Sequence, residues 1–112
     1  MTPQEYLPLT ETSFFILLCL AASPKHGYAI MKEVEAMSDK RVVLATGTLY
    51  SALRRMLDDD WIERLEDNLV SNGRERKFYQ LTEHGRSILQ AEIERLYKLV
   101  DLPQLRDLQE GR

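Results

Sequence analysis

The sequence predicts a mostly helical protein that contains one small β-hairpin. Apolar residues recur with the period of an α-helix in four segments. These segments span residues 10–22, 28–37, 47–59 and 83–102. Between the last two, residues 61–66 and 77–81 alternate between apolar and polar side chains, as strands do. Asn72-Gly73 lies between these stretches, and this pair is typical of hairpin turns because both residues tolerate positive φ.

Length and composition favour a single domain. The chain has 112 residues, of which 44% are hydrophobic, enough for one core and too many for a disordered chain. The longest apolar run, residues 14–22, is too short to span a bilayer and has no basic segment before it. We therefore expect a cytoplasmic protein. Cys19 is the only cysteine, and its place in that run predicts a buried, unreactive thiol rather than a redox site.

The charge distribution is more informative than the net charge of −3. Residues 25–56 carry six basic and three acidic residues, and residues 70–81 carry three basic residues and one acidic. Residues 57–69, between them, carry six acidic residues and one basic. Basic charge is thus concentrated in two short segments that can share one face. The acidic total predicts a modest, salt-sensitive non-specific affinity for nucleic acid.

The first two helical segments have clear boundaries. The first is almost continuously apolar, so we expect it to be largely buried, with Thr10 as its cap and Ser23-Pro24 as its end. The second follows His26-Gly27. The connector after it contains the apolar patch Val42-Val43-Leu44, which either pairs as a small strand or docks the loop.

The third helix combines a buried side with an exposed presentation surface. Its buried side is marked by Leu49, Leu53, Met56 and Leu57. Thr46 is a better chemical cap than Ala45, because its hydroxyl can accept a bond from an early helical N–H. The three aspartates at residues 58–60 oppose the helix dipole and predict that the helix ends there.

The last segment predicts a dimerisation helix. Thr82 can cap it and Pro103 ends it, which leaves residues 103–112 as a flexible tail. Its apolar residues repeat in the manner of a heptad seam. The seam consists of Leu89, Ile93, Leu96 and Val100. This helix is longer and more apolar on one side than so small a domain can bury, so we expect it to pack against a second copy.

This order of elements is that of a winged helix-turn-helix followed by a dimerisation helix. We divide the chain into an N-terminal arm (1–9), the winged helix-turn-helix (10–81), the dimerisation helix (82–102) and the tail (103–112). In this fold the third helix enters the major groove of DNA and the hairpin lies along the backbone or the adjacent minor groove. We therefore expect a homodimer that binds a pseudo-palindromic, double-stranded operator.

The candidate DNA contacts are hydroxyl, aromatic and basic side chains, which suit phosphates and base edges. They are Tyr28, Lys32, Thr46, Thr48, Tyr50, Ser51, Arg54, Arg55, Arg74, Arg76 and Lys77. Tyr50 and Arg54 lead this set because they share a helix edge. Structural alternatives exist: Tyr50 can cover the hairpin, and Arg54 or Arg55 can pair with Asp58. Weaker phosphate candidates are Lys25, Lys40 and Arg41.

The sequence offers less support for other functions. His26 and His84 lack metal-ligand spacing, and no phosphate-binding glycine loop or nucleophile triad occurs, so we expect no enzyme, metal or cofactor. We expect His26 to pack or bond locally at the start of its helix. The alternative is a winged-helix module that binds protein instead of DNA. A ligand sensor is a third possibility, with a cavity for a planar aromatic compound. That cavity would be lined by Phe14, Phe15, Leu96 and Tyr97.

Three sequence blocks resemble the PadR family of transcriptional regulators. They are His26-Gly27-Tyr28; Gly47-Thr48-Leu49-Tyr50 with Ala52-Leu53; and Arg76-Lys77-Phe78-Tyr79 with Leu81-Thr82 and Gly85. The blocks occur in order at compatible spacing, and the resemblance spans roughly residues 9–102. The single terminal helix resembles the short, compact branch of the family. The resemblance implies a dimeric repressor whose terminal helix packs across the dimer, and a small molecule that weakens operator binding.

The sequence departs from the family pattern at three places. Ala45-Thr46 replaces a frequent Ser-Pro pair before the third helix, which implies a less rigid start. Asp60-Trp61 replaces a frequent Gly-Leu pair and moves an indole to the start of the hairpin. Several compact relatives stack flat drugs on a Trp of the terminal helix, whereas this helix has Tyr97 and no Trp.

Overall fold

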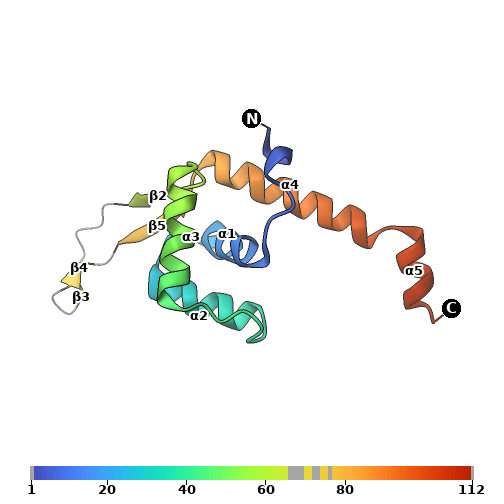
Figure 1. Ribbon diagram of the computed structural model, residues 1–112, viewed down its shortest axis with the longest axis horizontal. Helices are drawn as coiled ribbons and strands as arrows, with labels where there is room; N and C mark the ends of the chain where they lie inside the picture. Colours follow the sequence, from blue (N-terminus) through green and yellow to red (C-terminus); the bar gives the residue numbers. More distant parts are fainter. Residues whose placement is uncertain (1, 66–69, 72–73, 76, 112) are drawn as a thin grey trace.

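The computed structural model describes residues 2–65, 70–71, 74–75 and 77–111. It confirms the predicted fold class, a mostly helical chain with a small antiparallel sheet (Figure 1). The helices are η1 (Pro3–Tyr6), α1 (Glu11–Ala22), α2 (Gly27–Met37), α3 (Thr46–Asp58), α4 (Glu83–Val100) and α5 (Pro103–Gln109). The strands are β1 (Lys25–His26), β2 (Ile62–Leu65), β3 (Val70–Ser71), β4 (Arg74–Glu75) and β5 (Phe78–Leu81).

Side-chain caps begin three of the long helices. The Thr10 hydroxyl accepts a bond from Ser13 N–H at 3.1 Å, and the Thr82 hydroxyl accepts one from Gly85 N–H at 3.0 Å, as the sequence predicted. His26 Nδ1 accepts from Ala29 N–H at 3.3 Å, which confirms the local role expected of this histidine. Each cap satisfies an N–H that has no partner within its own helix.

The prediction of Thr46 as the cap of α3 was wrong. Ala45 is the N-cap, with extended backbone angles and no side-chain cap bond. The first helical bond runs from Leu49 N–H to the Ala45 carbonyl at 3.0 Å, so Thr46 is already inside the helix. The predicted helix start is one residue too late. The backbone hydrogen bonds determine where the helix begins, and the preference for a hydroxyl side chain at the cap does not.

The main sheet has three strands in the order β1-β5-β2, all antiparallel. β2 pairs with β5 from Ile62 opposite Leu81 to Leu65 opposite Phe78. The third strand, β1, pairs with the other edge of β5 and was not predicted, because two residues carry no periodic signal. The patch Val42-Val43-Leu44 forms no strand; it docks the loop through Leu44, which is buried.

Beyond the sheet, β3 and β4 continue the hairpin as a separate two-stranded ladder. Ser71 lies opposite Arg74, and Val70 lies opposite Glu75. The predicted turn residues Asn72 and Gly73 lie outside the described residues. In Figure 1 this hairpin extends away from the helices, beyond the ends of β2 and β5.

The core lies where α1, α2, α3 and the sheet meet, with α1 at its centre. Fully buried side chains on α1, α2 and α3 include Ile16, Leu17, Ile30, Val34, Leu49 and Leu53. Ile62 and Tyr79 close it from the sheet. α1 is buried on nearly all sides, in agreement with its almost continuous apolar sequence.

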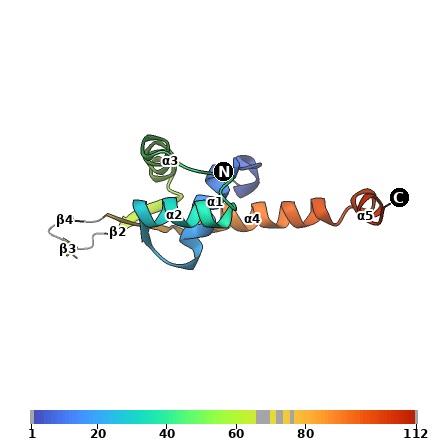
Figure 2. The same cartoon turned by 90° about the horizontal axis from the view of Figure 1, so that it is seen from below.

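The predicted heptad seam on α4 divides between two environments. Leu89 is 3% exposed and belongs to the core of its own chain, so it was wrongly assigned to a surface seam. Ile93 is partly buried against that core, whereas Val100 is 57% exposed. The reason is that α4 crosses α1 with its first half and extends beyond the domain with its second half (Figure 2).

The C-terminal tail is helical, contrary to the predicted flexible segment. α4 ends at Val100, and Pro103 begins α5 instead of merely ending α4. Proline is favoured in the first turn of a helix because its missing N–H would have no partner there. None of the helices in the described part of the chain is long and apolar enough to cross a membrane.

Candidate nucleic-acid interface

Helix α3 projects from one side of the molecule, as Figure 2 shows. Its inner side is fixed by four buried side chains that pack into the core. They are Leu49, Ala52, Leu53 and Met56. The remaining side chains from Thr46 to Arg55 are exposed. Because the inner side is anchored, the outer side has a fixed orientation and can act as a reading surface.

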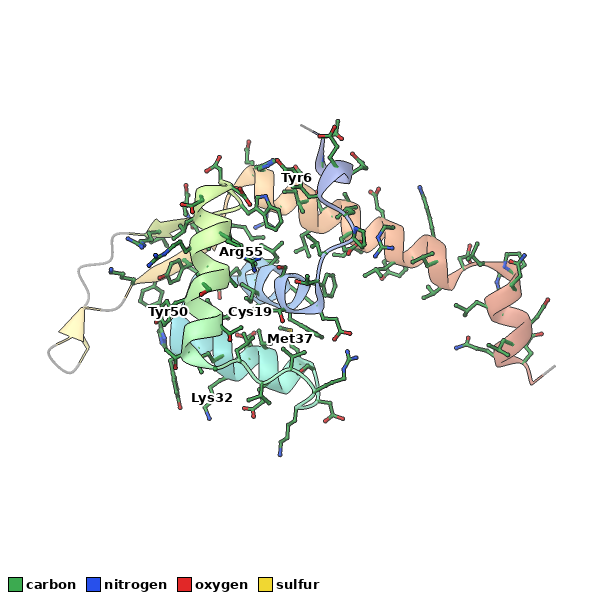
Figure 3. The ribbon with its side chains drawn as sticks, in the orientation of Figure 1. Tyr6, Cys19, Lys32, Met37, Tyr50 and Arg55 are labelled. Atoms are coloured by element: carbon green, nitrogen blue, oxygen red, sulfur yellow. The ribbon has the colours of Figure 1, made fainter. Side chains whose placement is uncertain are left out.

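Helical geometry divides the exposed candidates on α3 between faces. At about 100° per residue, Ser51 and Arg54 lie opposite the buried side, and Tyr50 lies at one edge next to Arg54. Arg55 follows Tyr50 by about 140° and lies at the other edge. Figure 3 shows Tyr50 and Arg55 on different sides of α3, with Arg55 toward α1. The predicted set of contacts on this helix is therefore not a single patch.

Tyr50 contacts the start of α2. It is 46% exposed, yet its hydroxyl oxygen lies only 2.6 Å from the position that a β-carbon on Gly27 would occupy. Only glycine leaves room for this approach. Tyr28, the next residue of α2, is 63% exposed, and the Lys32 ammonium lies 5.6 Å from the centre of its ring. The structure thus brings two tyrosines and a lysine, predicted separately, to the junction of α2 and α3.

The two arginines of α3 do not form the salt bridge to Asp58 that was the alternative to DNA contact. Within the described residues, neither Arg54 nor Arg55 forms an ion pair with Asp58 or any other carboxylate. Arg54 lines an open groove of about 630 Å³ between α3 and β2. Arg55 lines a different hollow, of about 110 Å³, together with Thr10 and Ser13 of the α1 start. Both guanidinium groups are available, but they point to different surroundings.

The C-terminal end of α3 is acidic. Asp58, Asp60 and Glu63 share the groove with Arg54 and Arg64. Asp60 also has a positive φ of 61°, which turns the chain from the helix into β2. Carboxylates repel DNA phosphates, so the N-terminal half of α3 is the part that suits a phosphate backbone.

The basic candidates outside α3 differ in whether they are exposed or already bound to another part of the protein. Lys77 is exposed beside β5, and Arg74 lies in β4, whereas Arg76 lies outside the described residues. Lys25, one of the weaker candidates, is engaged internally: its ammonium donates to the Cys19 carbonyl at 2.7 Å. Arg41, another, pairs with Glu11 at 2.7 Å.

Cys19 is buried, as its place in the apolar run predicted. Its thiol donates to Glu33 Oε2 at 3.4 Å. Burial, reinforced by the negative charge of Glu33, raises the pKa of Cys19 to about 12. The thiolate is therefore disfavoured, and Cys19 is an unreactive part of the core rather than a nucleophile.

An apolar groove of about 340 Å³ lies between α1 and the second half of α4. It is lined by Phe14, Leu18, Ile93, Leu96, Tyr97 and Val100. Three of the four predicted cavity residues are in this set. Phe15 is not: it packs against the core, with its ring centre 5.9 Å from that of Phe14. Consecutive helical residues diverge by about 100°, and here that divergence leaves Phe15 outside the groove that Phe14 lines.

No group of three or more histidine, cysteine or acidic residues in the described ranges is arranged to hold a metal ion. The exposed candidates in these ranges are polar and basic side chains on α3, at the start of α2 and at Lys77.

Comparison with known proteins agrees with this geometry. The model of the transcriptional regulator PadR-like family matches residues 16–91, more than half of the chain. The chain belongs to the PadR-like family. This is a family of transcriptional regulators rather than of enzymes, and the helices and small antiparallel sheet of the chain form its winged-helix fold.

Individual relatives are similar over different lengths. A 37.1 kDa protein in transposon TN4556 of Streptomyces fradiae is 36% identical over 89 residues, which cover 80% of this chain. The chain spans only 24% of that relative's length. A PadR family regulator from Clostridium difficile has 27% identity and a TM-score of 0.68, with 82% of this chain and 96% of that chain covered.

Bacillus subtilis PadR, solved in complex with operator DNA, shares the fold with a TM-score of 0.66 at 21% identity. The match covers 77% of this chain and 48% of that one. The family match ends within α4, so residues 1–15 and 92–112 lie outside it.

Proposed function

We propose that this PadR-like regulator is a repressor that binds a pseudo-palindromic operator as a homodimer. The observation that carries the proposal is the outer side of α3, where Ser51, Arg54 and Tyr50 are exposed on a helix anchored by its buried side. A projecting helix with hydroxyl, aromatic and guanidinium groups suits the major groove. The operator complex of Bacillus subtilis PadR, which shares this fold, supports the same use of it.

Each element has a distinct part in the proposed complex. Arg54 reads base edges, because it lies on the outermost side of α3 and has no ion-pair partner among the described residues. Tyr50, Tyr28 and Lys32, at the junction of α2 and α3, contact phosphates and fix the register. The hairpin, with Arg74, Arg76 and Lys77, follows the backbone. The carboxylates at the C-terminal end of α3 leave the phosphate contacts of this helix to its N-terminal half.

The apolar groove on α1 and α4 supports the proposed homodimer. Tyr97 is 70% exposed and Val100 is 57% exposed, and both line this groove with Leu96. A second copy related by a two-fold axis would cover these side chains and present a second α3. The two recognition helices would then lie about 34–36 Å apart, one turn of DNA.

A small aromatic effector is the third part of the proposal. The groove volume of about 340 Å³ is within the range of small-molecule sites, roughly 300–1,000 Å³. A planar compound between Phe14 and Tyr97 would alter the packing of α4 against its partner and release the operator. Because the proposed regulator binds DNA, we place it in the cytoplasm.

Selection of preferred DNA from a random pool by the purified protein tests the proposal. We expect a two-fold symmetric consensus that carries two half-sites. Binding to no DNA, together with retained folding and dimerisation, would contradict the proposal and favour the winged-helix module that binds protein. A single asymmetric site would contradict the homodimer alone. Calorimetry with phenolic acids and flat drugs tests whether an aromatic effector binds. If none of these compounds binds, the effector part of the proposal is wrong.

A further inference from the structure

The N-terminal arm is packed against α4 and against Trp61, the residue that leads from α3 into β2. In Figure 1, η1 lies beside the first half of α4. The ring of Tyr6, labelled in Figure 3, meets the Trp61 ring edge-on at 5.4 Å between centres. The same ring meets His84 edge-on at 5.6 Å. Trp61 follows the end of α3, and His84 is in the first turn of α4, so one side chain contacts both the connection after α3 and the start of α4.

A second anchor holds the arm to the middle of α4. The N–H of Leu9 donates to Glu92 Oε2 at 2.7 Å. Glu92 is only 2% exposed, and its other oxygen accepts a bond from Arg95. The hydrogen bond from Arg95 and the one from Leu9 lower the pKa of Glu92, although burial opposes them. A buried carboxylate that binds the backbone of the arm is a specific attachment, since it would be costly without these partners.

Trp61 is the joint between the recognition helix and α4. Its backbone N–H donates to the Met56 carbonyl of α3 at 2.9 Å. Its own carbonyl accepts a bond from Thr82, the cap of α4, at 3.1 Å. Gly85 also lies against this carbonyl, so closely that a β-carbon would be 1.9 Å from it. Movement at Trp61 would therefore change the orientation of α3 relative to α4.

We propose that residues 2–9 form a strap that fixes the angle between α3 and α4, with Tyr6 and Glu92 as its positioning residues. The inference rests on the proposed function: in a dimer built through α4, this angle sets the distance between the two recognition helices. The arm precedes residue 16, where the family match begins, so the strap is a feature of this chain beyond the matched segment.

The strap gives the regulator a narrow tolerance for half-site spacing. One base pair shifts a half-site by about 3.4 Å along the DNA axis and rotates it by about 35°. A joint held on two sides cannot follow this change without breaking the Tyr6 or Glu92 contacts. Without the strap, the contacts between Trp61 and Thr82 hold the joint, and the angle between α3 and α4 can change further at a lower free-energy cost. Spacing preference is thus the property that separates a positioning role from a merely stabilising one.

The test compares operators that differ only in spacing. Two half-sites from the selected consensus are placed at the preferred spacing and at one and two base pairs more or less. The strap variants are Tyr6→Ala, Glu92→Gln and a deletion of residues 2–8. Gln4→Ala, on the exposed side of η1, and Glu94→Gln, an exposed glutamate on α4, are matched controls.

We expect the wild-type protein and both controls to prefer the correct spacing by about tenfold or more over a one-base-pair change. The strap variants should reduce that ratio to about two- to threefold and keep the dimer in sedimentation. Strap variants that lose thermal stability but keep the wild-type spacing ratio would overturn the strap and leave the proposed function intact. Failure of the wild-type protein to bind any DNA would overturn both.

A measurement without DNA gives an independent readout. Spin labels on a Ser51→Cys variant, in a Cys19→Ala background, report the distance between the two α3 helices of a dimer. We expect a narrow distance distribution with the strap intact and a clearly wider one in Tyr6→Ala and Glu92→Gln. Equal widths in all variants would contradict the strap even if DNA binding changed.

Discussion

The hydroxyl oxygen of Tyr50 lies over the backbone of Gly27, 2.6 Å from where a β-carbon would be. This contact joins the edge of α3 to the first residue of α2. It holds an exposed aromatic ring in one orientation, which lowers the entropy lost when the hydroxyl binds a phosphate. Because Gly27 has no side chain, it leaves the space in which Tyr50 rests, and it thereby affects the proposed DNA surface.

A Gly27→Ala substitution should displace the Tyr50 ring without unfolding the protein, because the tip of a flexible side chain can move. We expect operator affinity to fall about tenfold, the cost of one lost hydrogen bond to a charged group. Gel-shift titration measures this loss. In a Tyr50→Ala background the same change should have little further effect, and a full additional loss there would contradict the proposed coupling.

Arg54 and Arg55 should differ in their effects, although they are adjacent. Arg54→Ala removes a guanidinium from the outermost side of α3, and we expect a loss of about 1–3 kcal/mol with relaxed preference at one base pair. Arg55→Ala should cost clearly less, because Arg55 points toward Thr10 and Ser13. Titration of both variants against the selected operator and its point substitutions checks this order. Equal losses would refute the assignment of the outer side.

Lys77 should act through charge alone. Its removal by Lys77→Ala is expected to weaken binding to all sequences and to reduce the salt slope of the affinity by about one. Arg41→Ala is the matched control, because Arg41 is already paired with Glu11 at 2.7 Å. Affinity measured over a series of salt concentrations gives the slopes. A change in sequence preference on loss of Lys77 would point to a base contact instead.

Gly85→Ala should destabilise the protein strongly. The new β-carbon would meet the Trp61 carbonyl at 1.9 Å, and backbone atoms cannot move aside as a side-chain tip can. We expect the free energy of unfolding to fall by about 3 kcal/mol, the upper end of overpacking effects. Gly47→Ala, with nothing within 4 Å of its β-carbon, should instead be neutral or stabilising by up to about 1 kcal/mol. Urea unfolding of both variants measures these values.

Cys19 should be unreactive in the folded protein and should make stability depend on alkaline pH. Its pKa is about 12 when folded, above the ordinary thiol value of 9.0, so the native state holds the thiol proton more tightly than the unfolded chain. This contribution is complete below pH 9 and is lost as the pH rises toward 12. We expect slow alkylation by iodoacetamide at pH 8 and no alkaline loss of this kind in Cys19→Ala. Rapid alkylation of the native protein would contradict the buried thiol.

Local signals predicted much of the fold. Thr10 and Thr82 were identified as caps because capping depends on a side chain and the three residues after it. The strands on either side of Asn72-Gly73 were predicted because alternation and turn chemistry are both local. The two-residue strand β1 was missed, since its only cause is the free edge of β5, which no local pattern reveals.

The candidate site was predicted less completely than the fold. The residue types at Tyr50 and Arg54 indicated a DNA surface, but the contact of Tyr50 with Gly27 needed the placement of α2 against α3. Phe15 and Leu89 were misplaced because an apolar residue does not show whether it faces its own core or a surface. The paired states of Lys25 and Arg41 also depend on distant partners.

The sequence alone determined the order of the four long helices and of strands β2 and β5, the caps Thr10 and Thr82, and the kinds of side chain on α3, because these depend on neighbours along the chain. Tertiary structure decided where Tyr50 rests, which arginines share a face, and that the arm binds Glu92 and Trp61. Leu9 and Glu92 are 83 residues apart in sequence. The packing of the whole core brings these two residues together, and no local sequence pattern predicts a contact over such a separation.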